Sequence, residues 1–283
     1  HQDGKLTTDD VLRIFLITEN YLFRRNICEV PTNALNKIFL NLNKEIIRYD
    51  NTADDYVSKF IYALLSKKES GRFPDDDEFG LALTEKQVYQ MRGKYKAYLF
   101  ERFENYGTIE TKDVYTHLDN NIYTIEHIMP QHLTPVWQKE LGDDYEQIHE
   151  LWLHRMANLT LTAYNSKYGN SSFTEKKTMQ NGFDDSGIRM NTWIAKKDKW
   201  TLAELEERSE YLMGRALTIW AAPVTEYKPK EKQLDTYTLE DEGELTGRLI
   251  VKFTFKNTEQ PVTSWVEMFQ KVIQILYAED KTI

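Results

Sequence analysis

The stretch Ile125-Glu126-His127-Ile128-Met129-Pro130 places a carboxylate and an imidazole side by side, directly after a short β-prone run at residues 122–125. A second β-prone run, residues 158–162, follows further along the chain. It opens with Asn158, and Asn165 comes shortly after it. The pattern therefore predicts two short strands that carry a Glu-His pair and two Asn side chains.

These residue types suit the hydrolysis of a phosphodiester with one divalent metal. The reaction needs an activated water and positive charge on the scissile oxygens, and an imidazole that titrates near neutrality is the natural base. Mg²⁺ prefers oxygen ligands and takes few of them from the protein, so Glu126 and Asn165 can bind it while His127 deprotonates the water. Neighbouring strand residues point to opposite faces. Glu126 and His127 can therefore share one site only if the backbone turns or twists there.

Three segments of the chain together resemble a known nuclease family. Their patterns are Glu-His-Ile-x-Pro-Gln, then Met-Ala-Asn-Leu-Thr-Leu-Thr, then Tyr-Asn-Ser-Lys-x-Gly-Asn-Ser-x-Phe-x-x-Lys. They resemble the HNH (ββα-metal, His-Me finger) nuclease domain called DUF1524, the C-terminal part of modification-dependent restriction enzymes of the GmrSD type. The run at residues 22–33 resembles the helical segment before that domain. The resemblance implies a metal-dependent DNA endonuclease domain of a type IV restriction or phage-defence protein.

The resemblance also implies a role for individual residues. His127 would be the general base, and Asn158 would orient it through a backbone or imidazole hydrogen bond. Glu126, where many related enzymes carry Asp, would bind Mg²⁺ or Mn²⁺. Asn165 would be the second metal ligand, with Asn170 as the alternative. The lysines that could contact phosphate are Lys167, Lys176 and Lys177.

The expected partner is DNA, including modified phage DNA. In related proteins an NTP-hydrolysing domain or subunit of the DUF262 type controls the nuclease. The sequence holds no Gly-rich phosphate loop, so we expect that partner to be absent from this chain.

Charge and cysteine content narrow the function classes. A formal net charge of −9 argues against non-specific coating of nucleic acid, although residues 151–200 carry a net positive charge. The single cysteine, Cys28, excludes an internal disulfide and a structural Cys₄ zinc site. No apolar run approaches the roughly twenty residues of a membrane span, and the N-terminus is not a secretory signal. We therefore expect a protein of the bacterial cytoplasm without a membrane segment.

The predicted fold is mainly α, with a small ββα-metal core and a small C-terminal α+β module. We divide the chain into a helical domain at 1–115, a nuclease domain at 116–223, a linker at 224–234, and an α+β module of unknown role at 235–283. Apolar spacing and capping signals predict the helices. They are expected near residues 8–23, 33–46, 54–65, 84–105, 146–156, from 172 onward as the α of the ββα unit, 191–200, 202–220 and from 264 onward, with a loop at 70–77 and strands at 248–255 and 260–263.

Two other functions stay open. One is a nucleic-acid- or protein-binding module whose nuclease site is vestigial. The other is a helical interaction scaffold in which the Glu126-His127 pair is surface decoration. A zinc protease is rejected because its motif needs two His residues four apart, whereas His149 and His154 are five apart.

Overall fold

The computed structural model describes residues 6–229, 237–238, 245 and 247–279. The chain divides into two compact units, His1–Lys230 and Glu231–Ile283. Residues 224–229 of the predicted linker are described, and residues 230–234 lie outside the described residues. The finer division between a helical domain and a nuclease domain stays a prediction.

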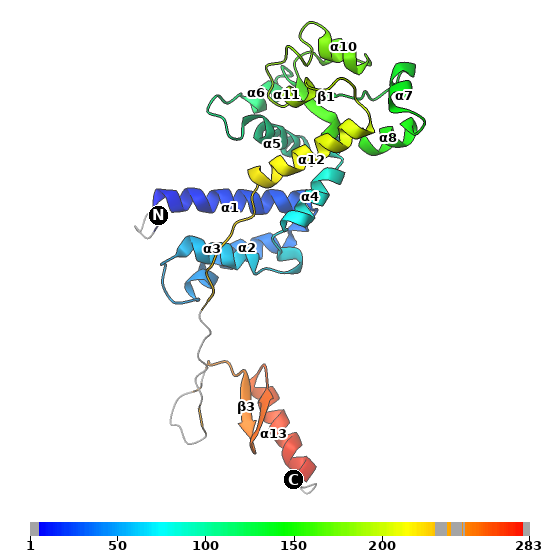
Figure 1. Cartoon of the computed structure of the whole chain (residues 1–283). Helices are drawn as coiled ribbons and strands as arrows, with labels where there is room; N and C mark the ends of the chain where they lie inside the picture. The colour runs from blue at the N-terminus through cyan, green and yellow to red at the C-terminus, as the bar shows by residue number, and fades with distance from the viewer. Residues whose placement is uncertain (1–5, 230–236, 239–244, 246, 280–283) are drawn as a thin grey trace. The chain divides into compact units, whose positions relative to one another are not determined.

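The first unit begins with three helices, α1 (Thr8–Ile27), α2 (Leu35–Ile47) and α3 (Tyr56–Leu65) (Figure 1). Thr7 and Asp10 form a capping box that starts α1, because each side chain accepts from the backbone N–H of the other. The short 3₁₀ helix Thr32–Ala34 follows Pro31 and leads into α2. A buried apolar cluster joins the three helices. It contains Ile17, Tyr21, Leu42, Ile46, Val57, Phe60, Ile61, Ala63 and Leu64.

The long helix predicted at residues 84–105 is wrong, because the chain breaks there. Helix α4 (Asp76–Glu85) starts within the stretch expected to be a loop, where the Asp75 side chain accepts from Glu78 N at 2.8 Å. It ends at Lys86, whose backbone is extended, and the 3₁₀ helix Val88–Gln90 separates it from α5 (Gly93–Asn105). Within this break, Tyr89 N donates to His154 O at 3.2 Å. A contact with a distant segment thus overrides the local helical pattern.

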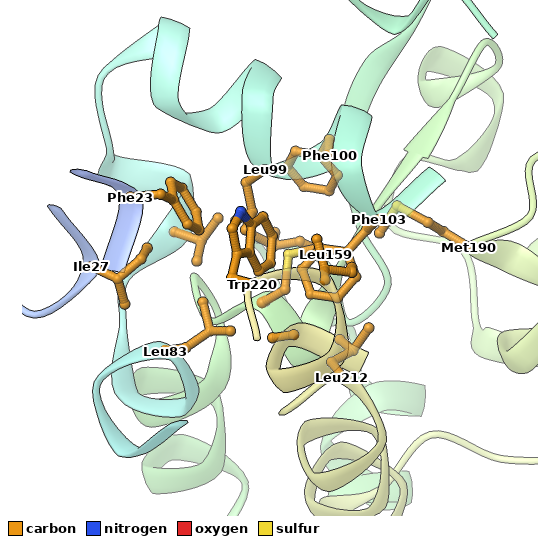
Figure 2. Packing of buried hydrophobic residues seen from close by; sticks show 14 of the residues in the cluster. Phe23, Ile27, Leu83, Leu99, Phe100, Phe103, Leu159, Met190, Leu212 and Trp220 are labelled. Atoms are coloured by element: carbon orange, nitrogen blue, oxygen red, sulfur yellow. The ribbon is translucent and has the colours of Figure 1, made fainter. Parts of the chain in front are cut away.

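Trp220 lies at the centre of the largest buried cluster (Figure 2). Its ring stacks on Phe23 of α1, with ring centroids 4.4 Å apart. Phe79 of α4 and Phe103 of α5 meet it edge-on. The same cluster includes Leu159 and Leu161 and residues of α12 (Leu202–Ile219). The two leucines belong to the second of the two central strands, β1 (Thr124–His127) and β2 (Leu159–Thr162). The N-terminal helices and the central strands therefore share one core.

The predicted pair of strands is present as β1 (Thr124–His127) and β2 (Leu159–Thr162), which pair antiparallel. The register places Glu126 opposite Thr160 and His127 opposite Leu159. The connection between the strands holds α7 (Pro135–Leu141), which the sequence did not predict, α8 (Tyr145–Trp152) and the 3₁₀ helix Met156–Asn158. Helix α8 ends before the predicted residue 156. Another unpredicted helix, α6 (Val114–Asp119), precedes β1.

Short helices follow β2. They are α9 (Asn165–Tyr168), α10 (Phe173–Thr178) and α11 (Asn191–Ile194), which is shorter than the predicted 191–200. Ser172 and Glu175 form the capping box that was predicted to start α10. The order β1, β2, α10 is the order predicted for the ββα unit.

The second unit contains β3 (Lys252–Phe255), β4 (Thr258–Pro261) and α13 (Trp265–Glu279). The two strands pair antiparallel. The first is shorter than the predicted 248–255, and the second begins two residues before the predicted 260–263. None of the helices in the described part of the chain combines the length and the apolar character that a membrane crossing requires.

Candidate active site

Glu126 and His127 occupy the last two positions of β1 and point to opposite faces of the two-stranded sheet. Both are buried, at 3% and 5% exposure. The Glu126 side chain meets Lys176 of α10, whereas the His127 ring meets His154 and Tyr89. The Glu126 and His127 side chains, although adjacent in the sequence, therefore contact different residues.

The Glu126 carboxylate forms a buried ion pair with Lys176. Lys176 Nζ lies 2.6 Å from Glu126 Oε1 and also donates to the backbone oxygens of His127 and Ile128, at 2.9 and 3.1 Å. These three bonds use all three donors of the ammonium group. Burial raises the pKa of Glu126 to about 7, against the opposing effect of Lys176. Lys176 is fully buried, so the phosphate contact predicted for it from sequence would require these bonds to break.

The His127 imidazole packs against the rings of His154 and Tyr89. Its Nε2 is 3.1 Å from Nδ1 of His154. The Tyr89 ring meets His127 edge-on at 4.4 Å and stacks on His154 at 5.3 Å. Burial lowers the pKa of His127 to about 3, and the positive charges of His154, Lys176 and His149 act in the same direction. The ring is therefore neutral at pH 7 and keeps a lone pair.

The Asn158 side chain forms hydrogen bonds to the backbone near both His127 and His154. Its Oδ1 accepts from Met129 N at 2.8 Å, and its Nδ2 donates to Met129 O at 2.9 Å and to Leu153 O at 3.1 Å. Met129 is two residues after His127, and Leu153 directly precedes His154. The sequence left open whether Asn158 bonds to the backbone or to an imidazole. The structure contains the backbone bonds.

Asn165 lies beside the outer edge of β1. Ile128 N bonds to Asn158 O across the sheet, so by the alternation of an antiparallel ladder the carbonyls of Ile125 and His127 face away from β2. Asn165 Nδ2 donates to Ile125 O at 3.3 Å, and Lys176 Nζ donates to His127 O. Asn165 thus contacts the edge of β1 at Ile125, the residue directly before Glu126.

The remaining predicted site residues lie at the surface or near it. Asn170 and Lys167 are exposed, and the Lys167 ammonium lies 5.2 Å above the Tyr164 ring. Lys177 donates to Lys197 O at 2.7 Å and lies 3.4 Å from Asp198.

The donor set fits a divalent metal in part. Glu126 has a carboxylate, and Asn165, which bonds to Ile125 O beside it, has an amide oxygen. Hard cations such as Mg²⁺ take one or two such groups and fill the rest with water. Lys176 already holds one carboxylate oxygen, which leaves the other for a cation. Among the described residues, no three His, Cys, Asp or Glu side chains come together as a metal-binding group.

His154 and Tyr89 are the site residues that sequence reasoning missed. The spacing of His149 and His154 excludes a zinc-protease motif, but it carries no information on the contact between His154 and His127. The one signal of His154 in the sequence is its position four residues before Asn158. Tyr89 had none, because it lies in the predicted long helix, and its role depends on the break in that helix.

Comparison with known protein families gives a match to this part of the chain. No curated protein matches the sequence. A model of the family described as "GmrSD restriction endonucleases, C-terminal domain" matches residues 73–215. That match covers half of the 283 residues and contains β1, β2, α10 and every predicted site residue. The chain therefore belongs to the family of GmrSD restriction endonucleases, of which it carries the C-terminal domain.

Proposed function

We propose that this chain is a metal-dependent DNA endonuclease of the HNH type, from a modification-dependent (type IV) restriction or phage-defence protein. Membership of a restriction endonuclease family implies nuclease activity on DNA. The observation that carries the finer proposal is the position of the His127 imidazole at the end of β1, where Asn158 bonds to the backbone of Met129 on both its N–H and its oxygen.

His127 is the proposed general base. Its neutral ring can take a proton from water. The water oxygen then forms the new bond to phosphorus, while the bond from phosphorus to the leaving oxygen breaks. An imidazole with a low pKa is a weak base. The negative charge of a bound phosphate beside it raises that pKa toward neutrality, so we expect DNA binding itself to strengthen the base.

Glu126 and Asn165 are the residues that we propose to hold Mg²⁺ or Mn²⁺, with Asn170 as the alternative to Asn165. Because Glu126 and His127 point to opposite faces, the proposal requires the scissile phosphate to reach both side chains around the end of β1, which is at His127. A bound divalent cation supplies positive charge that stabilises the phosphate and the leaving oxygen. Lys176 fixes the Glu126 carboxylate through one oxygen and so sets the direction in which the other oxygen points.

Two of the predicted lysines remain proposed DNA contacts. Lys167 is exposed on α9, the helix that starts with Asn165, and can reach a phosphate without breaking an ion pair. Lys177 would have to leave Lys197 O, to which it donates at 2.7 Å, and its ion pair with the exposed Asp198. Such a pair is worth little at the surface.

The Glu126–Lys176 ion pair favours one alternative, a nucleic-acid- or protein-binding module with a vestigial nuclease site. In that case Lys176 acts as a permanent replacement for the metal. The alternative predicts DNA or protein binding without metal-dependent cleavage.

Cleavage of supercoiled plasmid tests the two functions. The substrates are plain, hydroxymethylated and glucosylated DNA, each incubated with Mg²⁺, Mn²⁺ or EDTA. The nuclease predicts nicking with a metal and none with EDTA. DNA binding without nicking, even after addition of an NTP-hydrolysing partner of the DUF262 type, would support the binding module.

A further inference from the structure

We propose that His154 is a positioning residue for His127: its Nδ1 accepts the Nε2–H of His127, which keeps the lone pair of His127 on Nδ1. The proposal rests on the proposed nuclease function and adds a second histidine to it. Nothing in the sequence pattern of the site assigned this role to His154.

The contact between the rings limits which nitrogen of His127 can act. Nε2 of His127 faces Nδ1 of His154 at 3.1 Å, and two neutral rings share only one proton in such a bond. If His127 donates, its Nδ1 keeps a lone pair and can take a proton from water. If His154 donates, Nδ1 of His127 carries the proton and the base is blocked. The first tautomer is therefore the productive one.

His154 is itself held firmly. Its ring stacks on Tyr89 with an interplanar angle of 12°, and its backbone oxygen accepts from Tyr89 N at 3.2 Å. Asn158 binds Leu153 O on one side and the backbone of Met129 on the other. One amide side chain thus fixes the segment that carries His154 relative to the segment that carries His127.

The same bond supports the change of charge during the reaction. When His127 takes a proton on Nδ1, the ring becomes an imidazolium and still donates from Nε2 to His154. A hydrogen bond from a charged donor is stronger than one from a neutral donor. A neutral His154 can therefore keep accepting this bond while His127 carries the charge that the proposed reaction creates.

Two substitutions separate positioning from packing. In His154→Asn, the side-chain oxygen can replace Nδ1 as the acceptor. In His154→Leu, the side chain still packs against Tyr89 but accepts no hydrogen bond. His132→Leu is the matched control, because His132 is exposed and precedes α7.

The first readout is the tautomer of His127, measured by ¹⁵N–¹H correlation on the full chain without metal. The chain has six histidines, so single substitutions assign the signals. We expect the Nε2–H tautomer in the wild type, in His154→Asn and in His132→Leu, and a loss of that preference in His154→Leu. A wild-type His127 protonated on Nδ1, or a tautomer that His154→Leu leaves unchanged, would overturn the proposal.

The second readout is DNA cleavage with Mg²⁺ or Mn²⁺. His154→Leu should lose about 10- to 100-fold in kcat with little change in KM, and His154→Asn should recover most of that loss. Equal kcat in His154→Leu and the wild type would overturn the proposal. If the wild type cuts no DNA while its His127 tautomer depends on His154, the nuclease function fails and the positioning of His127 stands.

Discussion

Lys176 is the residue on which the geometry of the candidate site depends most. Its ammonium group bonds to the Glu126 carboxylate and to the backbone oxygens of His127 and Ile128. All of these partners belong to the end of β1 or directly follow it. A residue expected from sequence to contact DNA is thus an internal cation that holds the strand end in place.

Replacing Lys176 with Met should lower the free energy of unfolding by about 3–5 kcal/mol, because the substitution leaves the Glu126 carboxylate buried without a partner. Lys177→Met is the control. Lys177 is only half-buried and its acidic partner Asp198 is exposed, so the change should cost less than about 1 kcal/mol. Urea denaturation followed by tryptophan fluorescence measures both. Equal effects would contradict the role of Lys176.

The loss in Lys176→Met should depend on pH. Burial raises the pKa of Glu126 from 4.5 to about 7 even with Lys176 present, and removing the ammonium raises it further. A carboxyl with a raised pKa holds a proton in the folded state that the unfolded chain releases, so stability falls as pH rises above 4.5. The deficit relative to wild type should be smaller at pH 5 than at pH 8. The double variant Glu126→Gln/Lys176→Met should lack this pH dependence, and a deficit that grows at pH 5 would contradict the account.

At the scale of elements, α10 is held in position by the turn that follows it. A Cβ atom at Gly182 would lie 2.5 Å from Lys177 O and 2.6 Å from Lys176 O. Since both atoms are backbone, Gly182→Ala must shift the end of α10. We expect a loss of about 1–3 kcal/mol, together with lower cleavage because Lys176 moves. At Gly187 a Cβ meets nothing within 4 Å, so Gly187→Ala should melt near the wild-type temperature. Equal melting temperatures for both variants would show that the turn tolerates a side chain.

The elements that the sequence predicted best are those with local signals. The capping box of Ser172 and Glu175 predicts the start of α10, and two short β-prone runs predict the sheet. The break between α4 and α5 has no comparable signal, because it is stabilised by the bond between Tyr89 N and His154 O. The contact between His154 and His127 also joins distant segments, so no local sequence signal predicts it. The sequence pattern predicts Glu126 and His127 at the end of a strand. Their partners Lys176 and His154 become evident only in the folded structure.

At the scale of the whole molecule, the family match and the folded unit have different bounds. The match covers residues 73–215, whereas the first compact unit spans His1–Lys230. Trp220 lies beyond the match and Phe23 before it, yet their rings stack in the core that also contains Leu159 of β2. The central strands therefore depend on packing from outside the matched segment.

A fragment of residues 1–230 should fold cooperatively and melt at the temperature of the full chain's first transition. A fragment of residues 73–215 should lack a cooperative transition, because it loses Trp220 and Phe23 from its core. Differential scanning calorimetry and near-UV circular dichroism distinguish the two. A cooperatively folded 73–215 fragment would show that the shared core is not required.

The central claim is that His127 is the base of a metal-dependent nuclease, and single-turnover cleavage tests it most directly. The comparison is between the wild type, His127→Ala and His132→Ala, with Mg²⁺ or Mn²⁺, at a temperature where circular dichroism shows all three folded. A general base contributes about 10²- to 10⁴-fold to rate. We therefore expect His127→Ala to lose at least about 100-fold and the exposed His132→Ala to cut like the wild type. Cleavage by His127→Ala at the wild-type rate would contradict the claim.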